Sequence, residues 1–446
     1  MPARDELKEK VQFAIDQRKE WIIQVSRTIL DHPEPGFLET KTSKLVSEKL
    51  DELGIHHQAG IALTGVKGRL TGGRPGPTVA LIGEMDSLKV PGHPKADPET
   101  GAAHACGHHA QIGMMLGAAV GLLAPEVMQS LAGNVALMAV PAEEFIDVEY
   151  RWKLHEEGKL GLMAGKQEFI RLGAFDDVDM AMMVHTTSRE YDGKFALGGT
   201  SNGHLVKYIQ FVGRAAHAGG APHAGVNALQ AAMIALNAIN AQRETMRNDH
   251  TIRIHGIMTR GGASVNSIPA DVRYEGRVRG RTTEAIEDAN AKVDRCFRAG
   301  ALAMGAAVNI ITIPGYLPMI NNETLKELFK ENAVRLVGEN QFVTHPRYRN
   351  SGGSTDMGDL SHIMPVIHPY AGGATGHGHS TEYMVEDYET AVINPAKVMA
   401  MAVIDLLDND AARAQEILAK NRPAMTREQY LAFQSQRLRE ELYEGR

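Results

Sequence analysis

The feature that most constrains this chain is a regular run of strand-like and helix-like segments between residues 204 and 315. The strand-like segments alternate in polarity along the chain, whereas the helix-like ones are longer and amphipathic or rich in Ala and Leu. The run has six segments in the order β-α-β-β-α-β: 204–213, 224–244, 251–260, 271–279, 282–304 and 306–315. This order is that of the split βαβ, or ferredoxin-like, module, so we expect one small inserted domain here.

The segments on either side of this module alternate between helices and buried strands. Residues 4–54 have helical periodicity interrupted by HPEPG at 32–36, and TVALIGEMDS from Thr78 and the segment Asn134–Val140 are typical of buried strands. Helix-like segments at 108–125, 322–337 and 395–408 predict a mostly parallel sheet with helices on both faces. We therefore expect an α/β fold with catalytic pieces at 1–198 and 317–446, a lid and dimerisation domain at 199–316, and a helical tail after Asp408.

Composition excludes several classes of protein. The 446 residues are 43% apolar and 23% charged, as in globular domains, and 47 basic against 54 acidic residues argue against nucleic-acid binding. The charged start MPARDELKEKVQ predicts no secretory signal, and no apolar run looks long enough to predict a membrane partner. With only two cysteines, Cys106 and Cys296, no disulfide framework is possible, which favours a cytoplasmic location.

Residues of metal-binding type gather in four short segments: His104–His109 (HACGHH), Glu143-Glu144, His185 and the glycine-rich Gly376–His379. Two of these segments follow predicted strands, where the ligand sites of open α/β sheets lie. Thiolate, imidazole and carboxylate together suit zinc, manganese, cobalt or iron better than calcium or magnesium. We therefore expect a metal centre built from several strand ends.

The spacing within these segments suggests which residues bind metal and which act as a base. Cys106 and His108 can face the same way from a loop, whereas the adjacent Glu143 and Glu144 cannot both point at one metal in regular structure. One carboxylate would then bind metal while the other activates water as a general base. Each segment alone also has an ordinary structural interpretation, such as a buried apolar cysteine or a surface pair of glutamates, so the argument depends on their occurring together.

The ordered set of motifs resembles the two-metal peptidase and amidohydrolase family of aminoacylases, glutamate carboxypeptidases, aminobenzoyl-glutamate hydrolases and auxin-conjugate hydrolases. The motifs are HPEPGF at 32–37, GEMDSLKVPG at 83–92, HACGHH at 104–109, PAEE at 141–144, VHTT at 184–187, GRAAHAGGAPHAGVNAL at 213–229 and HSTEY at 379–383. HACGHH is the most specific, because one branch of the family has cysteine where its sister branches have aspartate. His109 departs from this pattern, since that branch usually has aspartate there.

The resemblance implies a role for each matching residue. The implied metal ligands are Cys106 as the bridging ligand, His108, Glu144, His185 and His379, with His377 as the competing choice for the last. Glu143 would be the general base and Asp86 would orient the site from behind. His217 would stabilise the oxyanion, commonly in a neighbouring subunit, while Asn266 and Arg279 would contact a substrate carboxylate or else be a turn asparagine and a surface arginine.

The resemblance also implies an activity. It implies two divalent metal ions, Mn or Zn with Co or Ni as alternatives, in a homodimer or larger homo-oligomer that associates through the lid. The expected reaction is hydrolysis of an amide C–N bond in a small carboxylate-bearing N-acyl or N-aroyl amino acid or peptide, by a metal-activated hydroxide. A nitroanthranilate-type aryl-amine aminohydrolase and a non-catalytic binding protein remain as alternatives. The long segment 146–164, with Tyr150, Trp152 and His155, either lines the substrate pocket or elaborates the surface.

Overall fold

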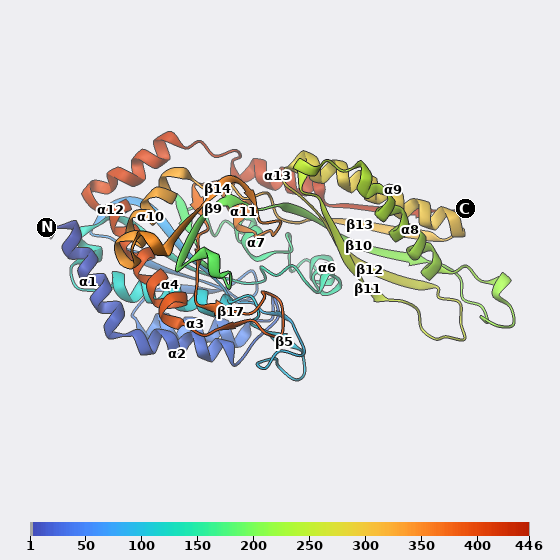
Figure 1. The fold of residues 1–446 in the computed structure, drawn as a ribbon, viewed down its shortest axis with the longest axis horizontal. Helices are drawn as coiled ribbons and strands as arrows, with labels where there is room; N and C mark the ends of the chain where they lie inside the picture. The colour runs from blue at the N-terminus through green and yellow to red at the C-terminus, as the bar shows by residue number, and fades with distance from the viewer. Residues whose placement is uncertain (1–2, 446) are drawn as a thin grey trace.

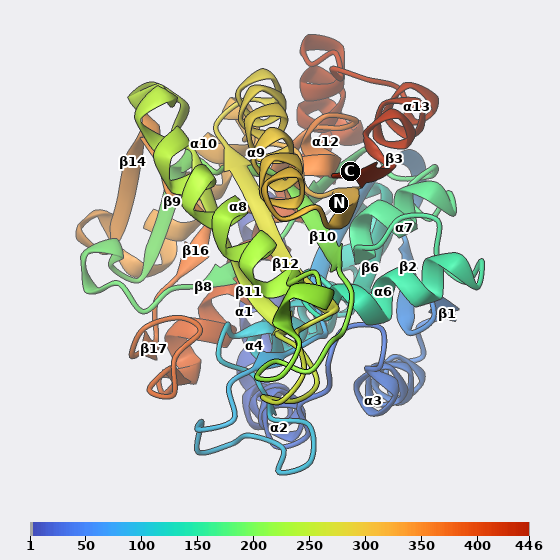
Figure 2. The same ribbon diagram turned by 90° about the vertical axis from the view of Figure 1, so that its right-hand side faces the viewer.

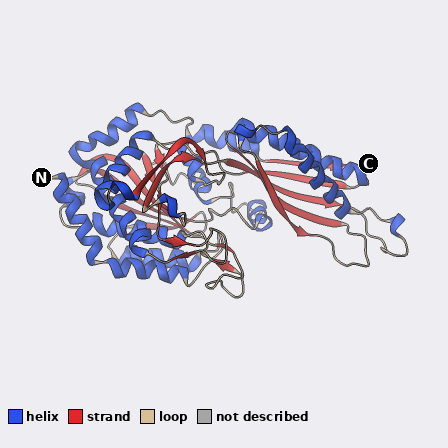
Figure 3. Cartoon of the chain, in the orientation of Figure 1, coloured by secondary structure: helices blue, strands red, loops and turns tan. Residues whose placement is uncertain are grey.

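The computed structural model describes residues 3–445. Two bodies lie end to end, with the N-terminus at the outer end of one and the C-terminus at the outer end of the other (Figure 1). The large domain is built on a six-stranded sheet, and the lid domain on a five-stranded sheet (Figure 3). This arrangement confirms the predicted fold class of a mostly parallel α/β domain with an inserted ferredoxin-like domain.

The sheet of the large domain is parallel in its centre. Its strand order is β1 (His57–Ile61), β2 (Gly65–Thr71), β6 (Ala132–Val140), β3 (Arg74–Glu84), β7 (Met180–Met182) and β15 (Val366–Ile367). The pairs β6–β3, β3–β7 and β7–β15 are parallel, whereas β1 and β2 join one edge in antiparallel register. The strand ends of β3, β6 and β7 therefore meet at one edge of the sheet.

Both faces of this sheet are covered because β3 is apolar on both sides. Val79 and Leu81 belong to one hydrophobic core, and the alternate residues Ala80 and Ile82 belong to the other. The helices packed on the first face are α1 (Arg4–Gln17), α2 (Lys19–Leu30), α3 (Thr40–Glu52), α4 (His108–Leu122), α5 (Val127–Ser130), α10 (Glu323–Val337) and α12 (Asn394–Lys420). Those on the second are α6 (Val148–Glu156), α7 (Gly165–Arg171), α11 (Met357–Ser361) and α13 (Arg427–Arg437).

The helical segment Glu389–Lys420 is long and apolar enough to cross a bilayer by length and composition alone. Its most apolar window is wholly buried inside the large domain, where α12 contacts α1, α4 and α10. The helix is interrupted at Asp408–Ala411, where the backbone angles are not helical. Its apolar character is therefore accounted for by its position in the core of the large domain.

Short strands hold the loops beside the main sheet. A four-stranded sheet has the order β14 (Phe342–Asn350), β9 (Phe195–Thr200), β16 (Tyr370–Ala371) and β8 (His185–Thr186). Two small ribbons pair β4 (Leu88–Lys89) with β5 (Ala102–Ala103) and β17 (Ala374–Thr375) with β18 (Met384–Val385). His185 is thus the first residue of a paired strand and not part of a free loop.

The lid sheet has the predicted connectivity. Its order is β11 (Arg253–Arg260), β12 (Asp271–Gly280), β10 (Gly203–Val212), β13 (Ala307–Pro314) and β19 (Arg439–Glu444), with all neighbours antiparallel. The helices α8 (Ala228–Gln242) and α9 (Thr283–Met304) lie side by side across one face of this sheet (Figure 2). On the opposite face of the lid sheet, Val206 of β10 and Ile311 of β13 pack against Phe145 and Val148 of the large domain.

The C-terminal tail differs from the helix predicted for it. It is helical in α13, but residues Arg439–Glu444 then pair with the edge of β13 as β19. Glu440 accepts a hydrogen bond from Asn309 (2.9 Å), and Glu441 pairs with Arg298 (2.7 Å). The charged residues that suggested a solvated helix therefore form ion pairs and hydrogen bonds that hold β19 against the lid. Local periodicity cannot predict such a tertiary pairing.

Candidate metal centre

The site forms where three parallel strands end. β3 ends at Glu84 with Asp86 just beyond it, β6 ends before Glu143 and Glu144, and His185 follows β7. The segment between β5 and α4 brings Cys106 and His108 to the same edge; Gly107 between them has φ 92°, a left-handed conformation that glycine adopts without strain. Residues far apart in the sequence are thus brought together by the sheet topology.

Two groups of ligand atoms share Cys106. One group is Cys106, His108 and His185, the other is Cys106, Glu144 and His379, and within each all the donor atoms lie within 4.8 Å of one another. Cys106 Sγ lies 3.4 Å from His185 Nε2, and His379 Nε2 lies 3.2 Å from Glu144 Oε1. These five residues are the five that the sequence predicted as ligands, and their donor types suit a pair of cations that share a thiolate. His377 is in neither group.

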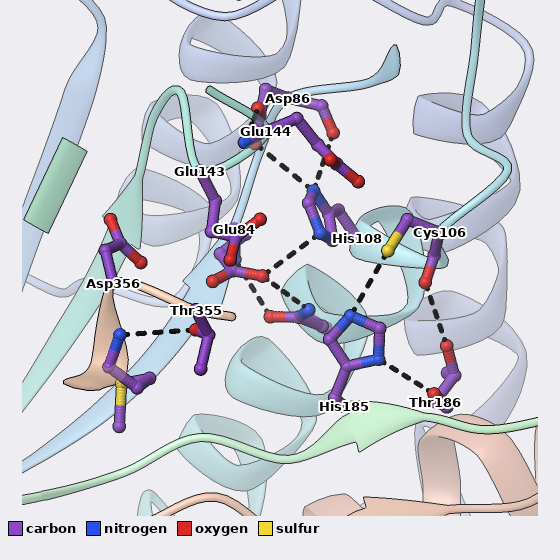
Figure 4. A network of polar contacts seen from close by, with 12 residues as sticks. Glu84, Asp86, Cys106, His108, Glu143, Glu144, His185, Thr186, Thr355 and Asp356 are labelled. Atoms are coloured by element: carbon purple, nitrogen blue, oxygen red, sulfur yellow. Dashed lines mark hydrogen bonds and ion pairs between the residues drawn. The ribbon is translucent and has the colours of Figure 1, made fainter. Parts of the chain in front are cut away.

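The two buried histidines are oriented by their second ring nitrogen. Nδ1 of His185 donates to the backbone carbonyl of Thr186 (2.8 Å), and Nδ1 of His108 donates to the carbonyl (2.9 Å) and carboxylate (3.2 Å) of Asp86 (Figure 4). In both rings the Nε2 lone pair is then left for a metal. Asp86 also accepts a hydrogen bond from the backbone N–H of Glu144 (2.8 Å), so it holds two predicted ligands from behind.

The charges of the site favour the thiolate form of Cys106 and the protonated form of His379. Burial and the charge of Glu144 would raise the pKa of the Cys106 thiol, but the imidazoles of His185 and His108 outweigh both and lower that pKa to about 6. The carboxylate of Glu144 raises the pKa of His379 to about 11. Cys106 is thus ready to bind a cation as a thiolate, whereas His379 must release a proton when a cation binds.

Glu143 lies beside the centre without belonging to either group that shares Cys106. Its carboxyl is close to His108 and Glu84 and is buried (Figure 4). Burial, followed by the charges of Glu84 and Glu144, raises the pKa of Glu143 well above its ordinary range. A carboxyl with a raised pKa next to a metal centre is suited to carrying a proton.

The turn that presents the two glutamates is braced by the segment 146–164. Ala142 has φ 58°, an uncommon angle for a residue other than glycine, and Arg151 of α6 donates to its carbonyl oxygen (3.0 Å). Arg151 is fully buried and also reaches the carbonyl of Glu144 (3.3 Å). Through Arg151 this segment supports the backbone of Glu144.

Sequence reasoning missed an ion triad under the site. The fully buried Lys166 of α7 pairs with both Glu84 and Asp356. Glu84 in turn lies 3.1 Å from His108 Nε2 and accepts from Gln111 (2.8 Å). Asp356 could be suspected from its place near the predicted site, but a lysine inside an apolar stretch gives no signal that it will be buried beside two acids.

The lid residues predicted to contact substrate fall in two places. Arg279 of β12 donates from Nη1 to Ser354 (3.1 Å). Burial and the charge of Arg277 lower its pKa to about 10, and the charges of Glu143 and Glu144 oppose this shift, so Arg279 is within electrostatic range of both glutamates. His217 and Asn266 lie in two adjoining exposed loops, joined by the hydrogen bond from Ala218 N–H to the carbonyl of Asn266 (2.9 Å). The loop between β10 and α8, which carries His217, is at the end of the lid remote from the large domain (Figure 1).

Comparisons with known proteins find matches to this chain in both sequence and fold. The model of peptidase family M20/M25/M40 matches residues 80–400. The Xaa-Arg dipeptidase of Mus musculus is 31% identical over 340 residues, covering 74% of this chain and 70% of that protein. An aminobenzoyl-glutamate utilization protein from Klebsiella pneumoniae (TM-score 0.68, 20% identity, 88% and 97% of the two chains) and a dinuclear metal-binding M20 peptidase from Bacillus subtilis (TM-score 0.62, 21% identity, 87% and 98%) have the same fold.

Replacing Lys166 with methionine should destabilise the protein strongly. The substitution keeps the side-chain length but leaves the Glu84 and Asp356 carboxylates buried without a cation, which typically costs about 3–5 kcal/mol. The exposed Lys44, paired with Glu48, is the matched control, and Lys44→Met should change stability by less than about 1 kcal/mol. Denaturant unfolding of both variants measures this; equal, small losses would contradict the structural role given to the triad.

Replacing Glu39 with glutamine should alter how stability depends on pH. Burial, and then the charge of Asp86, raises the pKa of Glu39 from an ordinary 4.5 to about 8. A raised carboxyl pKa means that this group's contribution to stability is complete below pH 4.5 and is lost as the pH rises to about 8. Relative to wild type, Glu39→Gln should therefore melt at progressively higher temperature between pH 5 and pH 9.

The control for this change is Glu9→Gln, which removes a carboxylate from the exposed side of α1. Its melting temperature relative to wild type should stay constant over the same pH range. If the melting temperature of Glu39→Gln relative to wild type is also constant with pH, the pKa of Glu39 is not raised in the folded protein, which contradicts the prediction.

Proposed function

Because this chain belongs to peptidase family M20/M25/M40 and is a metal-dependent amidohydrolase, we propose that it cleaves the amide C–N bond of a small N-acyl or N-aroyl amino acid or dipeptide that bears a carboxylate. The observation that carries the proposal is the pair of ligand groups that share Cys106, with the buried Glu143 beside them. The dipeptidase relative is named for an amide reaction, which favours amide hydrolysis over release of an aryl amine.

We assign two divalent cations, manganese or zinc, to the two ligand groups. Cys106 would be common to both, with His108 and His185 completing one group and Glu144 and His379 the other. When bound, such cations lower the pKa of a water between them and polarise the scissile carbonyl. The two cysteines and the cytoplasmic location that they favour are consistent with a thiolate ligand that must stay reduced.

Glu143 would then act as the proton carrier. As water attacks the amide carbon, the Glu143 carboxylate takes one proton from it, and a C–O bond forms. The same carboxyl next gives this proton to the amide nitrogen, the C–N bond breaks, and an amine and a carboxylate leave. Burial and the acidic neighbours Glu84 and Glu144 raise the pKa of Glu143, which strengthens its hold on the transferred proton.

His217 is suited to holding the carbonyl oxygen as negative charge develops on it. Its Nδ1 accepts hydrogen bonds from the backbone N–H groups of Gly219 (3.2 Å) and Gly220 (2.9 Å), so Nε2 carries the proton and can donate. Because His217 and Asn266 lie at the outer end of the lid, we propose that they serve the site of a second subunit in a homodimer or larger homo-oligomer. Arg279 would bind the substrate carboxylate within its own subunit.

Replacing Glu143 with glutamine should abolish turnover while the metal content stays the same. The change removes a proton carrier that typically contributes about 100- to 10,000-fold, and it removes none of the five ligands. Hydrolysis of N-acyl amino acids and elemental analysis, with Glu156→Gln on the exposed side of α6 as control, measure the two effects. Near-normal turnover, or loss of metal together with activity, would show that Glu143 is not the base.

Mixing two inactive variants should restore activity if His217 acts between subunits. In a dimer of one Glu143→Gln and one His217→Ala subunit, one site has both an intact Glu143 and the partner's intact His217. Equal mixing with free exchange gives roughly a quarter of the sites in this state, so roughly a quarter of wild-type activity should return. No recovery after mass spectrometry has confirmed mixed dimers would restrict His217 to its own subunit or to no catalytic role.

A further inference from the structure

The face of the lid sheet that is turned away from α8 and α9 carries a cluster of basic side chains. On β11, Arg253 and His255 alternate with Ile254, and on β12, Arg277 and Arg279 flank Val278; both apolar residues pack in the core under the helices. In the register Arg253 is opposite Arg279, and His255 is opposite Arg277. Directly opposed residues point to the same side of a sheet, so all four lie on the face opposite α8 and α9.

These arginines have no acidic partners. Within residues 3–445, Arg253, Arg277 and Arg279 form no ion pair. The acid nearest to them on this face of β12, Glu275, already accepts the backbone N–H groups of Val148 and Glu149 at the start of α6. Unpaired arginines held together on one face repel one another, and an added anion would relieve that repulsion.

The cluster opens onto a cleft between the lid and the segment that follows β14. The cleft has a volume of about 310 Å³, and the titratable side chains that line it are all of basic type: Arg253, Arg279 and the imidazole of His255. Across it lie Asn350 and Ser351. The Nδ2 of Asn350 is buried and, among the described residues, has no hydrogen-bond partner, while its Oδ1 accepts from Gly352 N–H (2.7 Å).

His255 fixes the direction of Arg279. Burial, and then the charges of Arg279 and Arg277, lowers the pKa of His255 to about 4, so its ring is neutral at physiological pH. Neutral His255 accepts the Nε–H of Arg279 at Nε2 (3.1 Å), and Ser354 accepts from Nη1 (3.1 Å). One terminal nitrogen of Arg279 is left for the substrate, with Arg253 next to it on the outer side.

We propose that this cleft binds a second negative charge on the substrate, the side-chain carboxylate of an acidic leaving amino acid, through Arg253. The inference rests on the proposed amide hydrolysis and on Arg279 holding the α-carboxylate. An aspartate or glutamate released by the enzyme thus has one cationic partner for each of its two carboxylates. A substrate that releases arginine would place its positive side chain against Arg253, which repels it. We therefore expect this chain to prefer a different leaving amino acid from the one in the name of the Xaa-Arg dipeptidase relative.

The test compares leaving amino acids of the same shape and different charge. With metal-loaded enzyme, kcat/KM is measured for N-benzoyl-glutamate, N-benzoyl-glutamine and N-benzoyl-arginine. Glutamate should be preferred over glutamine by at least tenfold, and arginine should be the poorest. Arg253→Gln should reduce the glutamate-to-glutamine ratio at least tenfold, whereas Arg253→Lys, which keeps the charge, should retain part of it. Arg295→Gln, which removes a charge from the exposed side of α9, is the control and should leave the ratio unchanged.

Equal rates for glutamate and glutamine, faster cleavage of the arginine substrate, or a ratio that Arg253→Gln does not change would overturn the inference. If no amide is cleaved, the proposed function fails, and binding decides the inference separately. Calorimetry with free L-glutamate and L-glutamine should then show at least tenfold tighter binding of glutamate, lost in Arg253→Gln. Equal binding of the two amino acids would overturn it.

Discussion

The rest of the site depends on the position of one thiol, that of Cys106, which lies between the side chains of the four other predicted ligands. Cys106 Sγ belongs to both groups of donor atoms, so neither group is complete without it. The imidazoles of His108 and His185 favour its thiolate, and the thiolate in turn supplies negative charge that both cation positions need. The other four ligands come from separate segments of the chain, which the sheet topology brings together around this sulfur.

The protein holds this charged centre by means of buried polar contacts behind it. Asp86 contacts both His108 and the backbone of Glu144, and Arg151 supports the turn before Glu144 from the other side. Below them, the positive charge of Lys166 balances the negative charges of the buried carboxylates of Glu84 and Asp356. Such pairs are costly to desolvate, and they add positional order to the site more than they add stability.

Much of this architecture could be predicted from the residues because it has local causes. The HPEPG break between α2 and α3, the continuous apolar strand β3 and the six-segment order of the lid all leave periodic or turn signals in the sequence. The chemical types of the residues pointed to four segments, and the family resemblance of the motifs implied the five side chains of the two ligand groups. What escaped prediction depends on tertiary contact: the burial of Lys166, the pairing of β19 with β13, and the alignment of Arg253 with Arg279 across two strands.

The most direct measurement for the shared thiolate is anomalous diffraction from crystals of the protein loaded with zinc or manganese. The account predicts two metal peaks on opposite sides of Cys106 Sγ, each at bonding distance from the sulfur, which is about 2.3 Å for zinc. His108 and His185 should contact one ion, and Glu144 and His379 the other. A single ion, or two ions of which either lies beyond bonding reach of Cys106, would contradict the central claim.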